Sequence, residues 1–290
     1  MNGGDVAAEL DEDTDPDPRG LLTLAQAAAD EAAAMLADRR STGRPGVLAT
    51  KSSPTDVVTE ADRAAEAMIT ARILADRPAD RILGEEGGLS EPTGAGRESN
   101  VRWIVDPLDG TVNYLYGLPD FAVSIAAEVG GTIVAGVVHA PERREVFTAI
   151  AGQGAWLRAA GQPPVRLRCN TGVHLDRALV ATGFGYLAAR RKVQGEVVAA
   201  LLPLVRDIRR AGSAAVDLCS VAAGRVDAYY ERGVNYWDFA AGGLVATEAG
   251  ATLAGLSGRP PGSDLTIAAP QPLFGELHDQ LLGLRPDRDG

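Results

Sequence analysis

The chain of 290 residues has few cysteines and histidines, and this limits the functional classes to which it can belong. It contains only two cysteines, Cys169 and Cys219, so no framework of disulfides is implied and a reducing, cytoplasmic setting is expected. Cys219 lies in an apolar helical pattern, which is typical of a small buried hydrophobic residue. None of the three histidines, His139, His174 and His278, belongs to a motif, and we interpret them as structural or surface residues.

Long apolar runs and an excess of basic charge are missing as well. No apolar run reaches the length that crosses a membrane, so we expect no membrane insertion. The N-terminus is acidic rather than basic and then apolar, which is not the pattern of a signal peptide. The formal net charge of −11 argues against nucleic acid as a direct ligand.

The first twenty residues carry much of this negative charge. They hold seven carboxylates and a single arginine, Arg19, so we expect residues 1–20 to form a disordered acidic tail. The whole chain is 46% hydrophobic and 23% charged, which is ordinary for a soluble globular protein. Its length suits one large domain or two lobes.

Residues 21–163 are predicted to form an N-terminal α+β lobe. Its expected elements are two helices, a short strand and an antiparallel meander, over residues 21–40, 59–75, 81–84 and 121–157. Thr59, with Asp62 three residues later, resembles an acidic variant of the helix capping box.

Residues 164–290 are predicted to form a C-terminal α/β lobe, because strands and helices alternate there. The expected strands, of which the second is a strand or a turn, lie at residues 178–182, 207–211, 226–230 and 266–269. The expected helices lie at residues 187–205, 213–223 and 237–249 and from about residue 273.

The stretch Asp-Pro-Leu-Asp-Gly-Thr at residues 106–111 is the most informative in the chain. It follows the apolar run 103–105, which is typical of a short buried strand. Its proline fixes its own φ and its glycine permits a tight turn, which can aim Asp106, the Leu108 carbonyl and Asp109 at one cation. Such oxygen ligands suit Mg²⁺. Taken alone, the pattern also fits a solvated acidic turn.

Three further segments are candidates for a functional site because they lie at the ends of predicted strands and helices. Glu85 and the next glutamate close a strand, and neighbouring strands would bring them beside Asp106. Asp238 lies near the start of a helix, where a carboxylate also serves as an ordinary helix cap. Gly212 and Ser213 precede a helix whose unpaired N–H groups and positive dipole end form a natural phosphate site.

Together these segments resemble the signatures of the inositol monophosphatase family. Residues 106–111 followed by Asn113 are similar to the family's first signature, and residues 237–240 with 248–250 are similar to its second. Further matching segments are residues 51–52, 59, 62, 84–86, 212–215 and 227–231. The resemblance covers the chain from about Leu21 to its end, with every element in the family's order.

The resemblance implies a layered αβαβα sandwich of the α/β class and a Mg²⁺-dependent, lithium-sensitive phosphatase that is usually a homodimer. One Mg²⁺ would be held by Glu85, Asp106 and the Leu108 carbonyl. A second would be held by Asp106, Asp109 and Asp238. A third, looser ion near Glu85 is typical, so two or three ions are expected.

The chemistry of phosphate esters fits this implied metal centre. A phosphate monoester is anionic and hydrolyses very slowly without a catalyst, and two cations can neutralise the phosphoryl oxygens and activate a water. Glu85 and Thr111 would orient and deprotonate that water, with Asp62 hydrogen-bonding Thr111. No histidine is needed, because metal-bound water is far more acidic than bulk water.

Substrate contacts are expected from backbone N–H groups and from carboxylates. The residues expected to make them are Asp109, Gly110, Thr111, Gly212, Ser213, Ala214, Glu231 and Asp238. Of these, Glu231 matches the family position that contacts a sugar or cyclitol hydroxyl, and a carboxylate accepting from a hydroxyl is sensible chemistry. A surface acid at the end of a strand would have the same sequence signature.

The expected reaction is the hydrolysis of inositol monophosphate to inositol and phosphate by a metal-activated water. Relatives with the same metal core act on fructose 1,6-bisphosphate, 3′-phosphoadenosine 5′-phosphate or histidinol phosphate, and these esters remain alternatives. Residues 111–114 and 117–119 resemble the inositol branch more than the nucleotide branch. An alternative of another class is a regulatory protein that binds the transcription machinery, which could also be a role in addition to catalysis.

Overall fold

The computed structural model describes residues 16–42, 47–50, 57–90 and 99–288, so most of the predicted acidic tail lies outside the described residues. The first helix, α1 (Pro18–Ser41), begins before the predicted position at residue 21. Asp17 caps this helix, because its side chain accepts a hydrogen bond of 3.1 Å from the Arg19 amide. Residues 18–20 therefore belong to the helix and not to the tail.

A sheet of eight strands fills most of the first half of the chain. The strands are β3 (Arg81–Gly84), β4 (Gly88–Ser90), β5 (Val101–Asp109), β6 (Ala122–Val129), β7 (Thr132–Ala140), β8 (Glu145–Ile150), β9 (Gly154–Ala159) and β10 (Val165–Arg166). Their order is β10-β9-β8-β7-β6-β5-β3-β4, and β3 with β5 is the parallel pair. The run from β6 to β9 is the predicted antiparallel meander. A separate hairpin joins β1 (Val47–Thr50) and β2 (Val57–Thr59).

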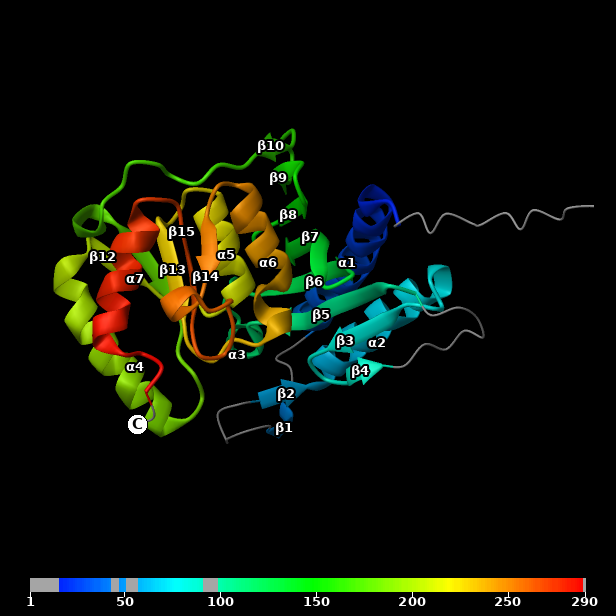
Figure 1. Cartoon of the computed structure of the whole chain (residues 1–290). Coiled ribbons are helices and arrows are strands. Elements are labelled where there is room, and N and C mark those ends of the chain that lie inside the picture. Colours follow the sequence, from blue (N-terminus) through cyan, green and yellow to red (C-terminus); the bar gives the residue numbers. More distant parts are fainter. Residues whose placement is uncertain (1–15, 43–46, 51–56, 91–98, 289–290) are drawn as a thin grey trace, which may run out of the picture.

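Alternate residues along these strands face two different layers of helices. Trp103 and Val105 pack on the side of α1 and α2 (Glu60–Asp76), and Ile104 between them packs on the side of α5 (Ala214–Ala222) and α6 (Tyr236–Glu248). Figure 1 shows the two pairs of helices on opposite sides of this sheet.

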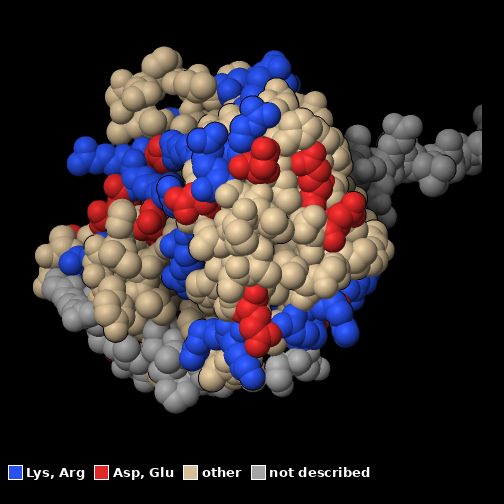
Figure 2. Space-filling model, turned by 90° about the vertical axis from the view of Figure 1, so that its left-hand side faces the viewer, with Lys and Arg blue, Asp and Glu red and all other residues tan. Residues whose placement is uncertain are grey.

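A second sheet follows in the other half of the chain. Its strands are β11 (Leu179–Thr182), β12 (Asp207–Arg209), β13 (Ala228–Glu231), β14 (Thr252–Ala254) and β15 (Thr266–Ala269), in the order β12-β11-β13-β15-β14. Helices α4 (Ala188–Leu201) and α7 (Leu273–Leu284) pack on its outer face, where Val197 and Leu277 lie against Val180 and Ile267 in one apolar cluster. Basic side chains gather on this side of the molecule (Figure 2).

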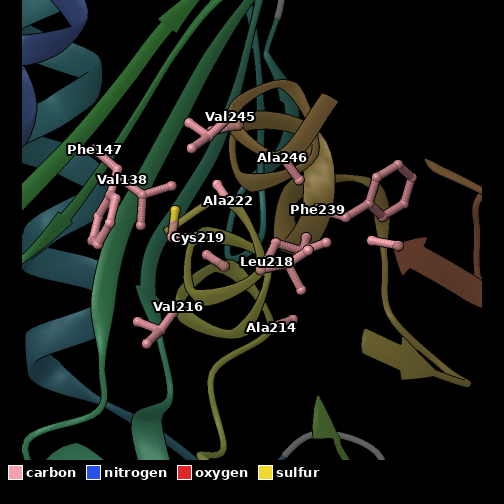
Figure 3. Close-up of a cluster of buried hydrophobic side chains, with 14 of the residues drawn as sticks. Val138, Phe147, Ala214, Val216, Leu218, Cys219, Ala222, Phe239, Val245 and Ala246 are labelled. Atoms are coloured by element: carbon pink, nitrogen blue, oxygen red, sulfur yellow. The ribbon is translucent and has the colours of Figure 1, made fainter. Parts of the chain in front are cut away.

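The layers therefore follow the predicted αβαβα order, with α5 and α6 in the middle (Figure 1). Cys219 of α5 is fully buried in this middle layer, near Val138 and Phe147 of the first sheet and Val245 of α6 (Figure 3). Its predicted role as a small buried hydrophobic residue is confirmed. No helix in the described ranges is both long and apolar enough to cross a membrane.

The chain differs from the prediction around the acidic stretch at residues 106–111. The predicted strand ends at residue 105, whereas β5 continues to Asp109 and its pairing with β6 is irregular between Asp106 and Asp109. A six-residue helix, α3 (Thr111–Tyr116), then begins after Gly110, whose φ of +99° favours glycine. The stretch is thus an irregular strand end followed by a helix rather than a simple turn.

Candidate active site

A cleft of about 390 Å³ lies where strand ends of both sheets meet the first turns of α3, α5 and α6. The predicted site residues that line it are Glu85, Asp106, Leu108, Asp109, Gly110, Thr111, Gly212, Ala214, Glu231 and Asp238. Two other predicted residues, Asp62 and Ser213, are buried next to the cleft and hydrogen-bond to residues in its wall. The structure thus brings the predicted residues together from segments far apart in the sequence.

Glu85 lies beside Asp106 because their strands are neighbours. In the parallel pairing of β3 with β5, Gly84 stands opposite Val105, and the Glu85 amide donates to the Val105 carbonyl at 3.2 Å. The next residue of each strand is therefore a carboxylate at the same sheet edge. This confirms the expectation that neighbouring strands place the two acidic segments side by side.

Asp106 is the most constrained carboxylate of the cleft. It is 1% exposed, and its Oδ1 accepts a hydrogen bond of 3.0 Å from the Leu108 amide. Burial raises the pKa of Asp106 well above its usual range, and the nearby charges of Glu85, Asp109 and Asp238 raise it further. Four acidic groups thus crowd one small region, and this crowding favours a positive ligand.

Asp109 reaches across from the first sheet to the start of α5. Its Oδ2 accepts hydrogen bonds of 2.7 Å from both the Ser213 hydroxyl and the Ala215 amide. Burial raises the pKa of Asp109 to about 6, although these hydrogen bonds, the Ala214 amide and the charge of Arg210 act in the opposite direction. The N-terminal amides of α5, predicted to face a phosphate, therefore already face this carboxylate.

Asp238 lies in the first turn of α6 and also caps it. Its Oδ2 accepts a hydrogen bond of 2.6 Å from the Asn235 amide, in a reciprocal capping box with Asn235. Burial raises the pKa of Asp238 well above its usual range, followed by the charges of Asp109 and Glu85. The helix cap and the place in the acidic cluster, which were alternatives in the sequence, are thus both present.

Thr111 and Asp62 form the hydrogen-bonded pair that the family resemblance implied. The Thr111 hydroxyl lies 2.9 Å from Asp62 Oδ1 and 3.2 Å from the Leu108 carbonyl, which are its two possible acceptors. The other oxygen of Asp62 accepts from the Thr59 amide at 2.8 Å, which completes the predicted capping box of α2. Burial raises the pKa of Asp62.

Glu231 ends β13 on the part of the cleft that the second sheet contributes. The Tyr229 hydroxyl donates to its Oε2 at 3.0 Å, and burial raises the pKa of Glu231 to about 7. Arg210 lies close enough to counteract that rise. Glu231 is therefore a held, half-buried carboxylate and not a freely solvated surface acid.

The chemistry of the acidic cluster fits divalent cations. Its donors are four carboxylates and the Leu108 carbonyl, all hard oxygen atoms of the kind that Mg²⁺ prefers. Within the described residues, no three acidic, imidazole or thiol side chains already form a metal cage. One oxygen of Asp109 and one of Asp238 accept backbone hydrogen bonds instead. The donor set fits the metal, and the side-chain arrangement is not a closed cage.

Sequence reasoning missed a group of residues that line the cleft after β11 and at the start of α4. These residues are Gly183, Phe184, Gly185, Tyr186, Leu187 and Arg190. Two glycines directly after a buried strand were the available signal, because they mark a tight path of the backbone at a strand end.

The chain is similar to proteins of one family over most of its length. The model of the inositol monophosphatase family matches residues 17–286. The chain is 46% identical to "Inositol-1-monophosphatase SuhB" of Mycobacterium tuberculosis, over 92% of this chain and 94% of that protein. It is 41% identical to "Nus factor SuhB" of Escherichia coli, over 82% of this chain and 86% of that protein. The solved structure "Mycobacterium tuberculosis SuhB" matches with a TM-score of 0.79 and 42% identity, over 94% of this chain and 100% of that one.

Proposed function

Because the chain belongs to the inositol monophosphatase family and is therefore a phosphatase, we propose that it hydrolyses inositol monophosphate to inositol and phosphate with Mg²⁺ as cofactor. The proposal is carried by the composition of one cleft, in which three carboxylates crowd around the carboxylate of Asp106, and Glu231 enters from the second sheet. The cluster of carboxylates suits cations that bind a phosphate, and the carboxylate of Glu231 suits a hydroxyl group of the alcohol.

The carboxylates would hold the metal ions in the way that the family resemblance implies. Glu85, Asp106 and the Leu108 carbonyl would hold one ion, and Asp106, Asp109 and Asp238 would hold a second, with a looser third ion near Glu85. Bound Mg²⁺ supplies Lewis-acid chemistry, which neutralises phosphoryl charge, acidifies water and stabilises a leaving alkoxide.

Thr111 and Asp62 provide the protein's own proton chemistry beside these ligands. When the Thr111 hydroxyl donates to Asp62 Oδ1, its oxygen lone pairs are left to accept a hydrogen bond from an attacking water. As the water attacks, its proton would pass to the Thr111 oxygen while the Thr111 proton passes to Asp62, and Glu85 would orient the water by accepting a hydrogen bond from its other hydrogen. This pair therefore fixes the direction of attack without a histidine.

The phosphate and the alcohol would be held by separate groups. We propose that the phosphate oxygens accept hydrogen bonds from the backbone amides of Gly110, Thr111, Ser213 and Ala214. The last two follow Gly212, which has no side chain to cover the backbone. The Ala214 amide would be shared between the phosphate and Asp109. Glu231 would accept a hydrogen bond from an inositol hydroxyl.

The test is phosphate release from inositol 1-phosphate, fructose 1,6-bisphosphate and 3′-phosphoadenosine 5′-phosphate, each with Mg²⁺, with EDTA and with added Li⁺. We expect Mg²⁺-dependent, Li⁺-sensitive release that favours inositol 1-phosphate. Metal-dependent release that favours another ester would change the proposed substrate and support the proposed mechanism. Release that persists in EDTA would contradict the metal assignment.

One observation favours esters with two phosphate groups as a second candidate. Arg190 of α4 lines the cleft, and within the described residues no ion pair joins it to a carboxylate. A second phosphate on the substrate would meet this charge. A loss of fructose 1,6-bisphosphate turnover in Arg190→Gln, with inositol 1-phosphate turnover retained, would support this candidate. The opposite pattern would remove it.

A regulatory role beside catalysis also remains a proposal. It is supported by the name of the Escherichia coli relative, "Nus factor SuhB". A pull-down with the Asp109→Asn variant tests it, and the absence of a specific protein partner would count against it. We also propose a cytoplasmic homodimer: both cysteines are free and buried, which suits a reducing compartment, and Leu202 and Leu204 are exposed apolar residues that an interface could cover.

A further inference from the structure

Gln194 is a buried amide that ties together two strand ends of the second sheet. It lies on α4 and is 7% exposed. Its Oε1 accepts from the Gly185 amide at 2.9 Å, and its Nε2 donates to the carbonyls of Gly183 at 3.4 Å and Arg232 at 3.3 Å. Gly183 directly follows β11 and Arg232 directly follows β13, so one side chain spans the ends of two neighbouring strands.

Gly183 in turn lies directly against Glu231. A methyl group built on Gly183 would overlap the carboxylate of Glu231, so only a residue without a side chain leaves that carboxylate its present place. The Tyr229 hydroxyl holds Glu231 Oε2 at 3.0 Å. The position of Glu231 is therefore set by Tyr229 within its own strand and by the backbone of Gly183, directly after the neighbouring strand β11.

The amide of Gln194 is chemically matched to this place. It meets one N–H donor and two carbonyl acceptors, which together use its oxygen and both of its N–H groups. A carboxylate of the same shape would face two carbonyl oxygens without a proton to donate. An apolar side chain would leave three buried backbone groups without these partners.

We infer that Gln194 is a positioning residue for substrate selection: by holding Gly183 and Arg232 together, it fixes Glu231 at the place where a polyol hydroxyl is read. The inference rests on the proposed function, because it takes Glu231 as the hydroxyl acceptor. It predicts that Gln194 affects the binding of the alcohol and not the chemistry at the phosphate.

The experiment measures kcat and KM for inositol 1-phosphate and for p-nitrophenyl phosphate, which has no polyol. Gln194→Met keeps the length of the side chain and removes its hydrogen bonds. We expect KM for inositol 1-phosphate to rise about tenfold, with kcat and both aryl phosphate parameters changed less than about twofold. In a Glu231→Ala background, the same substitution should add little. Equal losses on both esters, or additive losses in the double variant, would overturn the inference.

Two further variants keep the test decisive. Gln153→Met is the matched control, because the Gln153 side chain accepts from Arg19 in the exposed turn between β8 and β9. This substitution should leave the turnover of both esters unchanged. Gly183→Ala probes the same link without touching α4, in case Gln194→Met does not fold. It should raise KM for inositol 1-phosphate in the native background and be tolerated in Glu231→Ala, where the overlapping carboxylate is gone.

The outcomes separate this inference from the proposed function. If the native protein favours inositol 1-phosphate through Glu231, and a folded Gln194→Met leaves that preference unchanged, the inference alone is wrong, whatever the effect of Gly183→Ala. If the native protein treats both esters alike and Glu231→Ala changes neither selectively, the assigned role of Glu231 fails, and the inference fails with it.

Discussion

The Ser213 hydroxyl donates a hydrogen bond of 2.7 Å to Asp109 Oδ2, across 104 positions of the chain. The bond joins the end of β5 in one sheet to the start of α5 in the middle layer. Together with the bond from the Ala215 amide, it places a proposed metal ligand at the positive end of a helix. Metal binding at Asp109, as we propose it, would therefore be coupled to the packing of α5.

Asp109→Asn should lower kcat by orders of magnitude while the protein stays folded. The substitution removes the charge of a proposed metal ligand and changes packing little, because the two side chains have nearly the same shape. The measurement is Mg²⁺-dependent phosphate release together with the melting temperature. Ser213→Ala is the milder companion, since it removes a single hydrogen bond and leaves the charge. Activity near that of the native protein in Asp109→Asn would show that the metal assignment is wrong.

Thr111→Val should lower kcat by about 10²-fold and leave KM nearly unchanged. Valine matches threonine in shape and cannot exchange a proton between Asp62 and a water. Thr111→Ser keeps the hydroxyl and serves as the control, with activity within a few-fold of the native protein. Single-turnover rates at saturating substrate would separate the chemical step from binding. Equal activity in the valine and serine variants would remove Thr111 from the proton path.

Truncation at the N-terminus should have two different effects, depending on where it ends. Removing residues 1–15 should leave activity and melting temperature unchanged, as their composition predicts. Removing residues 1–19 also deletes the cap Asp17 and the contact of Arg19 with Gln153, and should lower the melting temperature by about 2–4 °C. Thermal melts of the two truncated proteins test this. Identical melts would show that Asp17 does not stabilise α1.

His139 should make stability depend on mildly acidic pH. Burial lowers the pKa of His139, and the nearby Arg158 also lowers it, against the opposing effect of Asp30, whose Oδ1 lies 2.8 Å from His139 Nδ1. Because the folded pKa lies below the ordinary value of about 6.5, the unfolded chain takes up the proton first as the pH falls. The neutral His139 therefore contributes its whole stabilisation above a pH of about 6.5. This contribution declines as the pH falls below that value, until the pH also passes the pKa of His139 in the folded protein.

The measurement for His139 compares melting temperatures at about pH 7.5 and about pH 5.5. The native protein should lose more stability across this interval than His139→Gln, because the glutamine that replaces His139 does not titrate. A loss of equal size in both proteins would assign the pH dependence to other groups.

Much of the candidate site could be predicted from sequence because its residues come in short, chemically distinctive segments at strand and helix ends. Asp106 and Glu85 follow apolar strands, and adjacency of those strands was enough to bring them together. The αβαβα layering was implied by the resemblance to the inositol monophosphatase family, whereas the alternation of strands and helices predicted only the α/β lobe of residues 164–290. Thr59 and Asp62 were recognised as a cap from their spacing alone.

The remainder depends on contacts that leave no local pattern. Nothing in the sequence near Asp109 indicates that its partner is the Ala215 amide. The loop carrying Phe184 and Tyr186 holds no metal or phosphate motif, so its place in the cleft follows only from the position of β11 in the sheet. Helix α4 ends at Leu201 instead of residue 205, where Pro203 in the next turn interrupts the regular hydrogen bonding.

Residues from two halves of the chain line the cleft, which lies at the middle layer of α5 and α6. Asp106 comes from the first sheet, whereas Glu231 and Asp238 come from segments after the exposed turn at residues 160–164. A protein cut within that turn would yield two fragments that each lack part of the site. Recovered phosphatase activity would then show that the two fragments had associated, so activity itself can serve as an assay of fragment complementation.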